Sequence, residues 1–156
     1  MPNRPMQGMR RLNYLIAETD AVYHELAHRL GVADSTLQIL YTICDAGADG
    51  CCPLPLICRW TGVNRQTVYS AVRKLQAEGL VQLQASDAKS KLVCLTPQGW
   101  QLARRTALPL QRLENEILAA WPKQDVEVYL ALTERFLLDL KEKGREGLTP
   151  MEQEDP

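Results

Sequence analysis

The sequence lacks the features that would assign it to a membrane-spanning or secreted class. No apolar run reaches the length of about 20 residues that a membrane-spanning helix needs. Residues 1–15 include basic side chains but no uninterrupted apolar core and no small-residue cleavage site, unlike a signal peptide. No internal repeat is present either. We therefore expect a cytoplasmic protein that makes no contact with membranes.

Cysteine occurs in no pattern typical of a disulfide framework or a zinc ribbon. The five cysteines are an odd number and include no C-x-x-C pair: Cys44, Cys51, Cys52, Cys58 and Cys94. The adjacent pair Cys51-Cys52 has poor geometry for an ordinary disulfide. In a reducing cytosol the default is free thiols, several of them buried as small apolar side chains. Cys51 and Cys52 fall in an expected loop and are the candidates for a thiol sensor.

The chain has enough apolar residues for a core, and its charge is unevenly distributed. Its 156 residues are 46% hydrophobic and 24% charged, with a net charge of −1. This composition suits one globular domain, or a small module with a dimerisation extension. Residues 59–91 carry six basic residues against two acidic ones, and residues 1–11 carry three arginines and no acid. Binding to phosphate requires such local positive charge, so the distribution favours nucleic acid.

The centre of the chain predicts a winged helix-turn-helix. The expected order is a short helix from Pro53 to Trp60, a turn over 61–63, a helix over 65–78, and strands over 80–84 and 91–95. Proline is tolerated in the first turn of the short helix, because those amides have no intrahelical partner. Asn64 caps the second helix, and Gly79 ends it. Alternating apolar and polar residues indicate a β-hairpin whose tip, over 85–90, is polar.

Amphipathic helices are expected on both sides of this unit. They cover residues 9–30, residues 35–44 with Asp34 or Ser35 as the cap, residues 97–120 with an interruption and kink at Pro109, and residues 124–143. The run 45–50 is expected to be a loop. We predict a dimerisation helix within 1–33, a DNA-binding domain over 34–96, dimerisation helices over 97–143, and a disordered tail over 144–156.

The helix over 65–78 has an apolar face and a polar face. Val68, Ala71, Val72 and Leu75 would pack on the short helix through Ile57 and Cys58. Arg65, Gln66 and Ser70 are suited to base edges in the major groove, and Arg73 and Lys74 to phosphates. Asn64 and Thr67 suit a phosphate or a thymine methyl group. The candidate DNA-binding residues are Asn64, Arg65, Gln66, Thr67, Tyr69, Ser70, Arg73 and Lys74, with Lys89 and Lys91 in the wing.

Four short motifs give the sequence a specific resemblance. They are R-x-T-V at Arg65–Val68, L-x-x-x-G-L-V at Leu75–Val81, D-x-[RK]-S at Asp87–Ser90, and L-T-x-x-G at Leu95–Gly99. Together with the flanking helices, residues 9–143 resemble the MarR family of bacterial transcriptional regulators. The sequence departs from the family pattern in two places, with Lys89 in place of the common wing arginine and Arg73 where many members carry an acid. These departures bear on the operator sequence.

The resemblance implies a fold and a function. The fold is mainly α with a small β-hairpin wing, with six helices of which the outer ones build a homodimer. The implied function is that of a regulator, such as a repressor, that binds a palindromic operator in double-stranded DNA. A small aromatic or amphipathic effector, bound in a pocket between the dimerisation helices and the winged domain, would release the regulator from DNA. Tyr14, Tyr41 and Trp100 are candidates for lining such a pocket, although aromatic residues on helical stripes are commonly core.

A competing motif lies in the first helix. His24, Glu25 and His28 match H-E-x-x-H, and Gly31 and Asp34 extend the match toward a zinc metallopeptidase. Only 23 residues precede the motif, too few for a substrate-binding sheet, and no methionine lies between Met9 and Met151.

We therefore expect neither an enzyme nor a cofactor. The readings that stay open are a metal bound at His24 and His28, a thiol-responsive regulator, exposed structural histidines, and a winged module that binds protein.

Overall fold

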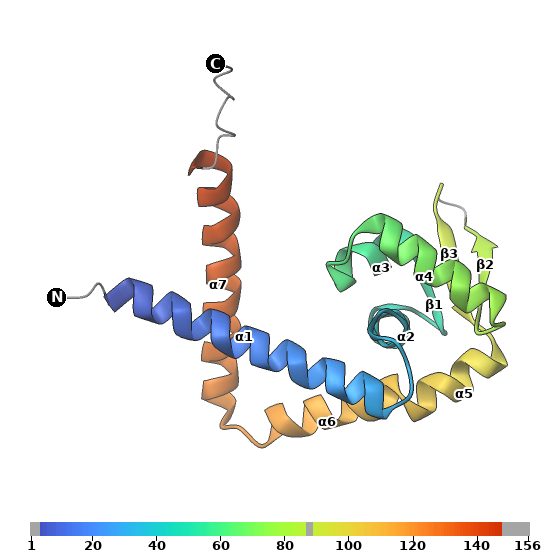
Figure 1. Cartoon of the computed structure of the whole chain (residues 1–156), viewed down its shortest axis with the longest axis horizontal. Coiled ribbons are helices and arrows are strands. Elements are labelled where there is room, and N and C mark those ends of the chain that lie inside the picture. Colours follow the sequence, from blue (N-terminus) through green and yellow to red (C-terminus); the bar gives the residue numbers. More distant parts are fainter. Residues whose placement is uncertain (1–3, 87–88, 148–156) are drawn as a thin grey trace, which may run out of the picture. The chain divides into compact units, whose positions relative to one another are not determined.

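The computed structural model describes residues 4–86 and 89–147, which form helices and one three-stranded sheet. The chain divides within helix α6 into two compact units, Met1–Arg112 and Leu113–Pro156, which are described separately. In the first unit, Figure 1 shows α2 lying between the winged elements and helix α5. The predicted class, mainly α with a small β wing, is confirmed. No helix among the described residues is long and apolar enough to cross a membrane.

The first two helices are α1 (Arg4–Arg29) and α2 (Asp34–Ala46). The prediction that Asp34 or Ser35 caps α2 is wrong, because the N-cap residue is Ala33 and no side chain caps the helix. Asp34 is instead the first helical residue, and its carboxylate lies 2.7 Å from Nδ1 of His24. The carboxylate is therefore held by α1 rather than by the first amides of its own helix.

The winged unit begins with a strand that the sequence did not reveal. Its elements are β1 (Cys51–Pro53), α3 (Leu54–Thr61), α4 (Arg65–Ala77), β2 (Val81–Ala85) and β3 (Lys91–Leu95). All pairs in the sheet are antiparallel, and β3 lies between β1 and β2. Three residues, one of them proline, are too few to show the alternation that indicates a strand. The expected loop over 45–50 therefore ends directly in the sheet.

The core of the first unit joins α2 to the winged elements. The apolar face of α4 is buried as predicted, with Val68, Val72 and Leu75 each at most 2% exposed, and Ala71 is half-buried. These side chains share a cluster with Ile57 of α3 and with side chains of α2 and the sheet. Because this face of α4 is fixed in the core, the opposite face of the helix is directed to solvent.

The helix predicted over 97–120 is two helices, α5 (Pro97–Arg105) and α6 (Ala107–Ala119). The break lies at Thr106, three residues before Pro109, where the kink was expected. A proline inside a helix has no N–H to donate and its ring clashes with the carbonyl four residues earlier, here that of Arg105. The chain avoids this clash by ending α5 there, so Pro109 falls in the first turn of α6.

Helix α5 is attached to the winged unit by Thr96 and Gly99. The Thr96 hydroxyl donates to the Gly79 and Leu80 carbonyls at 2.6 and 3.1 Å and accepts the Gly99 amide at 3.0 Å. Thr96 is therefore the N-cap of α5. Gly99 packs so closely on the Leu80 carbonyl that a Cβ on Gly99 would overlap the carbonyl oxygen.

We expect Gly99→Ala to lower the free energy of unfolding by about 1–3 kcal/mol, because the backbone at Leu80 must move to admit the methyl group. Urea denaturation measures the change. Gly144→Ala is the matched control, since a Cβ on Gly144 in α7 meets no atom within 4 Å. Alanine is the better helix former, so the control should be neutral or stabilising. Equal effects of the two substitutions would contradict the close approach seen at Gly99.

The second unit contains the end of α6 and helix α7 (Lys123–Gly147). Trp121 and Tyr129 pack edge to face with ring centroids 5.6 Å apart. None of the described residues of α7 is buried, although the helix carries large apolar side chains such as Phe136 and Leu137. Residues 144–147 were predicted to belong to a disordered tail but are helical; the rest of that predicted tail lies outside the described residues.

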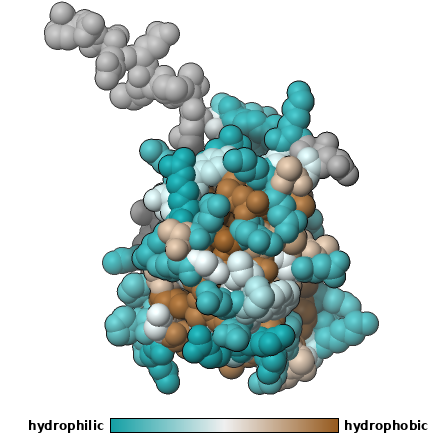
Figure 2. Space-filling model, turned by 90° about the vertical axis from the view of Figure 1, so that its right-hand side faces the viewer, coloured by the Kyte–Doolittle hydropathy of each residue, from teal (hydrophilic) through white to brown (hydrophobic). Residues whose placement is uncertain are grey.

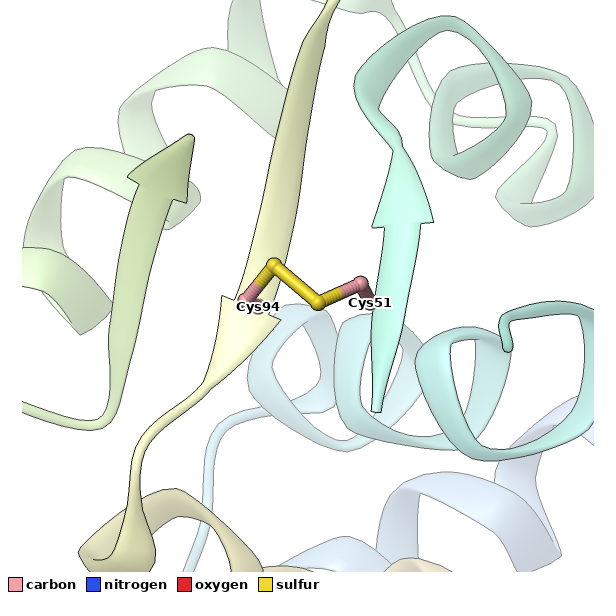
Figure 3. Close-up of a disulfide and its surroundings, with 2 residues drawn as sticks. All are labelled: Cys51 and Cys94. Atoms are coloured by element: carbon pink, nitrogen blue, oxygen red, sulfur yellow. A yellow bond between two sulfur atoms is a disulfide. The ribbon is translucent and has the colours of Figure 1, made fainter. Parts of the chain in front are cut away.

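The expectation that the cysteines are free thiols is wrong for two of them. Cys51 of β1 and Cys94 of β3 form a disulfide, which Figure 3 shows between the two strands. The sequence could not reveal this pair because β1 itself was not predicted. Cys44, Cys52 and Cys58 are free.

Candidate nucleic-acid interface

Helix α4 begins at a sharp turn that fixes its direction. Gly62 ends α3 in the left-handed region, with φ of 62°, which glycine adopts without a steric penalty. The Asn64 side chain then accepts a hydrogen bond from the Gln66 amide at 2.7 Å, as expected of an N-cap. The turn and the cap together set the first residues of α4 at the surface.

The structure gathers the predicted DNA-binding residues of α4 on one exposed face. All eight are exposed: Asn64, Arg65, Gln66, Thr67, Tyr69, Ser70, Arg73 and Lys74. Two open depressions run along this face, and Asn64, Gln66 and Ser70 line both of them. Arg65, Tyr69 and Arg73 border one depression, and Thr67 and Lys74 border the other. Long donors and acceptors therefore stand on both sides of a line of shorter polar side chains.

The charge of this face has one sign. Helix α4 contains Arg65, Arg73 and Lys74 and no acidic residue. The first acid after the helix is its C-cap residue, Glu78. A helix with this charge attracts phosphate along its whole length. Figure 2 shows the molecule from the side on which the wing strands lie. Most of the surface in this view is hydrophilic, with apolar groups between the hydrophilic ones.

The structure adds Ser35 to the candidate surface. This half-buried residue lies in the first turn of α2 and lines a depression together with Thr67 and Lys74 of α4. The sequence pointed to Ser35 only as a possible helix cap, because nothing in a single sequence indicates that the start of α2 lies beside α4.

The wing places two more basic side chains at the surface. Lys89 and Lys91 are both exposed, and Lys91 opens strand β3. The Ser86 hydroxyl donates to the Ser90 carbonyl at 2.7 Å, which joins the two sides of the tip. Asp87, part of the wing motif, lies outside the described residues. The wing is thus built to present positive charge next to the sheet.

The histidines of the H-E-x-x-H motif are both exposed on α1, and a metal bound at these two side chains stays a prediction. The His24 imidazole is engaged with Asp34, and both side chains are largely exposed. Among the described residues, no group of three or more His, Cys, Asp or Glu side chains could hold a metal ion. Asp34, which would be the third ligand of the extended motif, instead joins α2 to α1 through its contact with His24.

The three candidate effector residues differ in their surroundings. Tyr41 and Trp100 are half-buried against the core, and the Trp100 ring lies against Gly50, where a Cβ would approach it to 2.6 Å. The backbone carbonyl of Tyr41 accepts a hydrogen bond from Gln111 at 3.2 Å. Tyr14 is 61% exposed on α1. A shared pocket of these three residues stays a prediction.

The two candidate sensor cysteines also differ. Cys52 is fully buried in the core, and this burial raises the pKa of its thiol. A raised pKa lowers the population of the reactive thiolate. Burial, reinforced by the neighbouring Asp45, likewise raises the pKa of Cys44. Cys51 is half-buried and is bonded to Cys94.

Solved structures of MarR family regulators share this fold. One from Neisseria meningitidis matches with a TM-score of 0.78 and 17% identity over 90% of this chain and 99% of that chain. MepR from S. aureus, solved as a DNA complex, gives 0.63 and 15% over 84% and 96%. PcaV from Streptomyces coelicolor, solved with its natural ligand, gives 0.58 and 18% over 80% and 90%.

No protein-family model matches the sequence, and no curated protein does. At these identities, the likeness to solved structures establishes the fold. The chain therefore has the winged-helix fold of MarR family regulators, as the sequence resemblance implied.

Proposed function

We propose that this chain, with the fold of MarR family regulators, is a DNA-binding transcriptional regulator of that family. The observation that carries the proposal is the exposed face of α4, which combines base-reading donors with positive charge and contains no acid. In this proposal the protein is a cytoplasmic repressor that binds a palindromic operator, and it has no catalytic role. The DNA complex of MepR supports DNA as the partner of this fold.

The proposed contacts follow from position along α4. A helix in the major groove brings its N-terminal half to the base edges, so Arg65, Gln66 and Ser70 would read bases. Arg73 and Lys74 stand one to two turns further along and would contact phosphates, as would Ser35 from the start of α2. Lys89 and Lys91 would extend the contacts from the wing to an adjacent groove. Asn64, Thr67 and Tyr69 would complete the surface.

We propose a homodimer from the apolar side chains that each unit leaves exposed. In α1 these include Leu15, Ile16 and Val22, and in α7 they include Leu130, Phe136 and Leu137, all more than 40% exposed. A helix with such an apolar face needs a partner surface. A second copy related by two-fold symmetry would supply it and would place two α4 helices about 34 Å apart, one turn of DNA. The segments 1–33 and 97–143 are the proposed dimerisation regions.

A small-molecule effector would act on the same dimer. PcaV, a regulator of similar fold, was solved with its natural ligand, which supports the binding of a ligand by this fold. We propose a small aromatic or amphipathic effector for this chain. Tyr14, Tyr41 and Trp100 are the proposed contacts. Such a ligand releases DNA only if it binds the DNA-incompetent arrangement of the dimer more tightly than the competent one.

The proposal is tested by fluorescence anisotropy on the DNA upstream of the chain's own gene. We expect saturable binding, weakened about 10- to 100-fold by Arg65→Ala, because a bidentate contact to a base contributes about 1–3 kcal/mol. Arg104→Ala is the matched control, since Arg104 is exposed in the last turn of α5, outside the proposed interface. Failure to bind any palindromic upstream DNA, or equal losses in both variants, would refute the assignment.

A further inference from the structure

The disulfide between β1 and β3 lies where the sheet itself brings the two cysteines together. Cys51 is paired with Cys94 in the register of the two strands. The Leu95 amide donates to the Gly50 carbonyl at 2.8 Å, so the hydrogen bond lies outside the cysteine pair. Cys51 and Cys94 therefore form a non-hydrogen-bonded pair, the position at which facing side chains are closest. The backbone ladder would hold the two thiols opposite each other in the reduced chain as well.

The bond lies on the face of the sheet opposite the core. Cys52 and Val93, the neighbours of the two cysteines along the strands, are fully buried in the core cluster. Because side chains alternate along a strand, Cys51 and Cys94 are directed to the other face. Cys94 is only 2% exposed, whereas Cys51 is half-buried. A dissolved thiol therefore reaches the bond from the side of Cys51.

The bond also closes a loop that contains the proposed DNA-reading surface except Ser35 of α2. The 43-residue separation of the cysteines encloses α3, α4, β2 and the wing tip. All ten candidate DNA-binding residues lie inside it, from Asn64 to Lys91. Lys91 shares strand β3 with Cys94, three residues away. The bond thus ties the strand that carries the wing to the strand that leads into the helix-turn-helix.

We propose that Cys51 and Cys94 are a reversible thiol–disulfide couple that sets the DNA affinity of the winged unit by exchange with low-molecular-weight thiols through Cys51. This inference rests on the proposed DNA-binding function. In a reducing compartment a disulfide that forms at all is commonly a transient, regulatory one. The oxidised form binds DNA more tightly, because the bond restricts the motion of β3 against β1 and the wing then loses less conformational freedom when DNA binds.

The exchange proceeds in two balanced steps. A thiolate attacks the Cys51 sulfur, the Cys51–Cys94 bond breaks, and Cys94 leaves as a thiolate that takes a proton from water. A second thiolate then attacks the outer sulfur of the mixed disulfide. Cys51 leaves as a thiolate and is protonated, while the two reductant molecules depart as their own disulfide. Oxidation by a low-molecular-weight disulfide such as glutathione disulfide is the reverse sequence.

The test is a redox titration of the full-length chain in buffers of reduced and oxidised glutathione. After acid quenching and alkylation, peptide mass mapping follows the Cys51–Cys94 link, and anisotropy measures operator affinity at each ratio. We expect a reversible transition between dithiol and disulfide, with DNA binding about three- to tenfold tighter in the oxidised form. Cys58→Ser should leave both curves unchanged, since Cys58 is a free thiol.

The direction of attack is tested with single variants. Cys94→Ser leaves the accessible Cys51 and should form a mixed disulfide with glutathione, whereas Cys51→Ser leaves the buried Cys94 and should not. Both variants should bind DNA like the reduced wild-type chain.

A different pairing partner for Cys51, a link that glutathione neither forms nor opens, or equal DNA affinity in the two forms would overturn this proposal alone. Absence of DNA binding in both forms would overturn the proposed function as well.

Discussion

DNA affinity is expected to fall about ten-thousandfold when the salt concentration rises from about 50 to about 200 mM. Four basic side chains in each protomer are proposed to contact phosphates: Arg73, Lys74, Lys89 and Lys91. A homodimer would thus neutralise about eight phosphates, and each releases a counterion on binding, so the logarithmic slope is about −7. Anisotropy titrations of the same operator at several salt concentrations measure this slope.

Substitution of the same lysines separates phosphate contacts from base contacts. Lys74→Gln and Lys89→Gln should each reduce the slope by about two, because the dimer loses two phosphate contacts. Arg65→Ala should weaken binding chiefly to the preferred sequence, if Arg65 reads a base. Lys141→Gln in α7 is the control and should leave the slope unchanged. A slope near zero, or one that Lys141→Gln reduces as much as Lys74→Gln does, would contradict the assigned surface.

The candidate surface was largely accessible to sequence reasoning, because local rules determine it. Asn64 as a cap, a glycine turn before it and an apolar stripe through Val68, Val72 and Leu75 fix which face of α4 is exposed. Each of these features spans a few neighbouring residues. The exposed residues of α4 could therefore be named before any tertiary contact was known, although their roles on DNA remain predictions.

Features that depend on contacts between distant segments were not accessible. Strand β1 is recognised only through its pairing with β3. The bond between Cys51 and Cys94 depends on the same pairing and could not be predicted without it. The place of Ser35 beside α4 depends on how α2 packs, not on its own sequence. The position of the break at Thr106 was not accessible either, although Pro109 indicated that the helix is interrupted. A proline disrupts the turn that precedes it, and the way in which the chain avoids the clash determines where the helix ends.

Reduction of the Cys51–Cys94 bond is expected to lower the free energy of unfolding by about 4 kcal/mol. The bond closes a loop of 43 residues, and a cross-link of this span removes about that much chain entropy from the unfolded state. Urea denaturation of the oxidised and reduced chain measures the difference. Cys58→Ser should show the same difference between its two forms, whereas Cys94→Ser should show none. A difference below about 1 kcal/mol would mean that the cross-link does not constrain the unfolded chain.

The same free energy acts in the reverse direction, because linkage is reciprocal. If the disulfide stabilises the folded chain by about 4 kcal/mol, folding must stabilise the disulfide equally, by about three powers of ten in its equilibrium with thiols. At the midpoint of opening, the square of the thiol concentration divided by the disulfide concentration should therefore be about a thousandfold lower in urea than in native buffer, as alkylation and mass analysis would reveal. A couple with equal midpoints in both conditions would show that the strands β1 and β3 contribute nothing to bringing Cys51 and Cys94 together. Folding would then not influence whether Cys51 and Cys94 are oxidised or reduced. Oxidation or reduction of this pair could in turn not affect α4 and the wing.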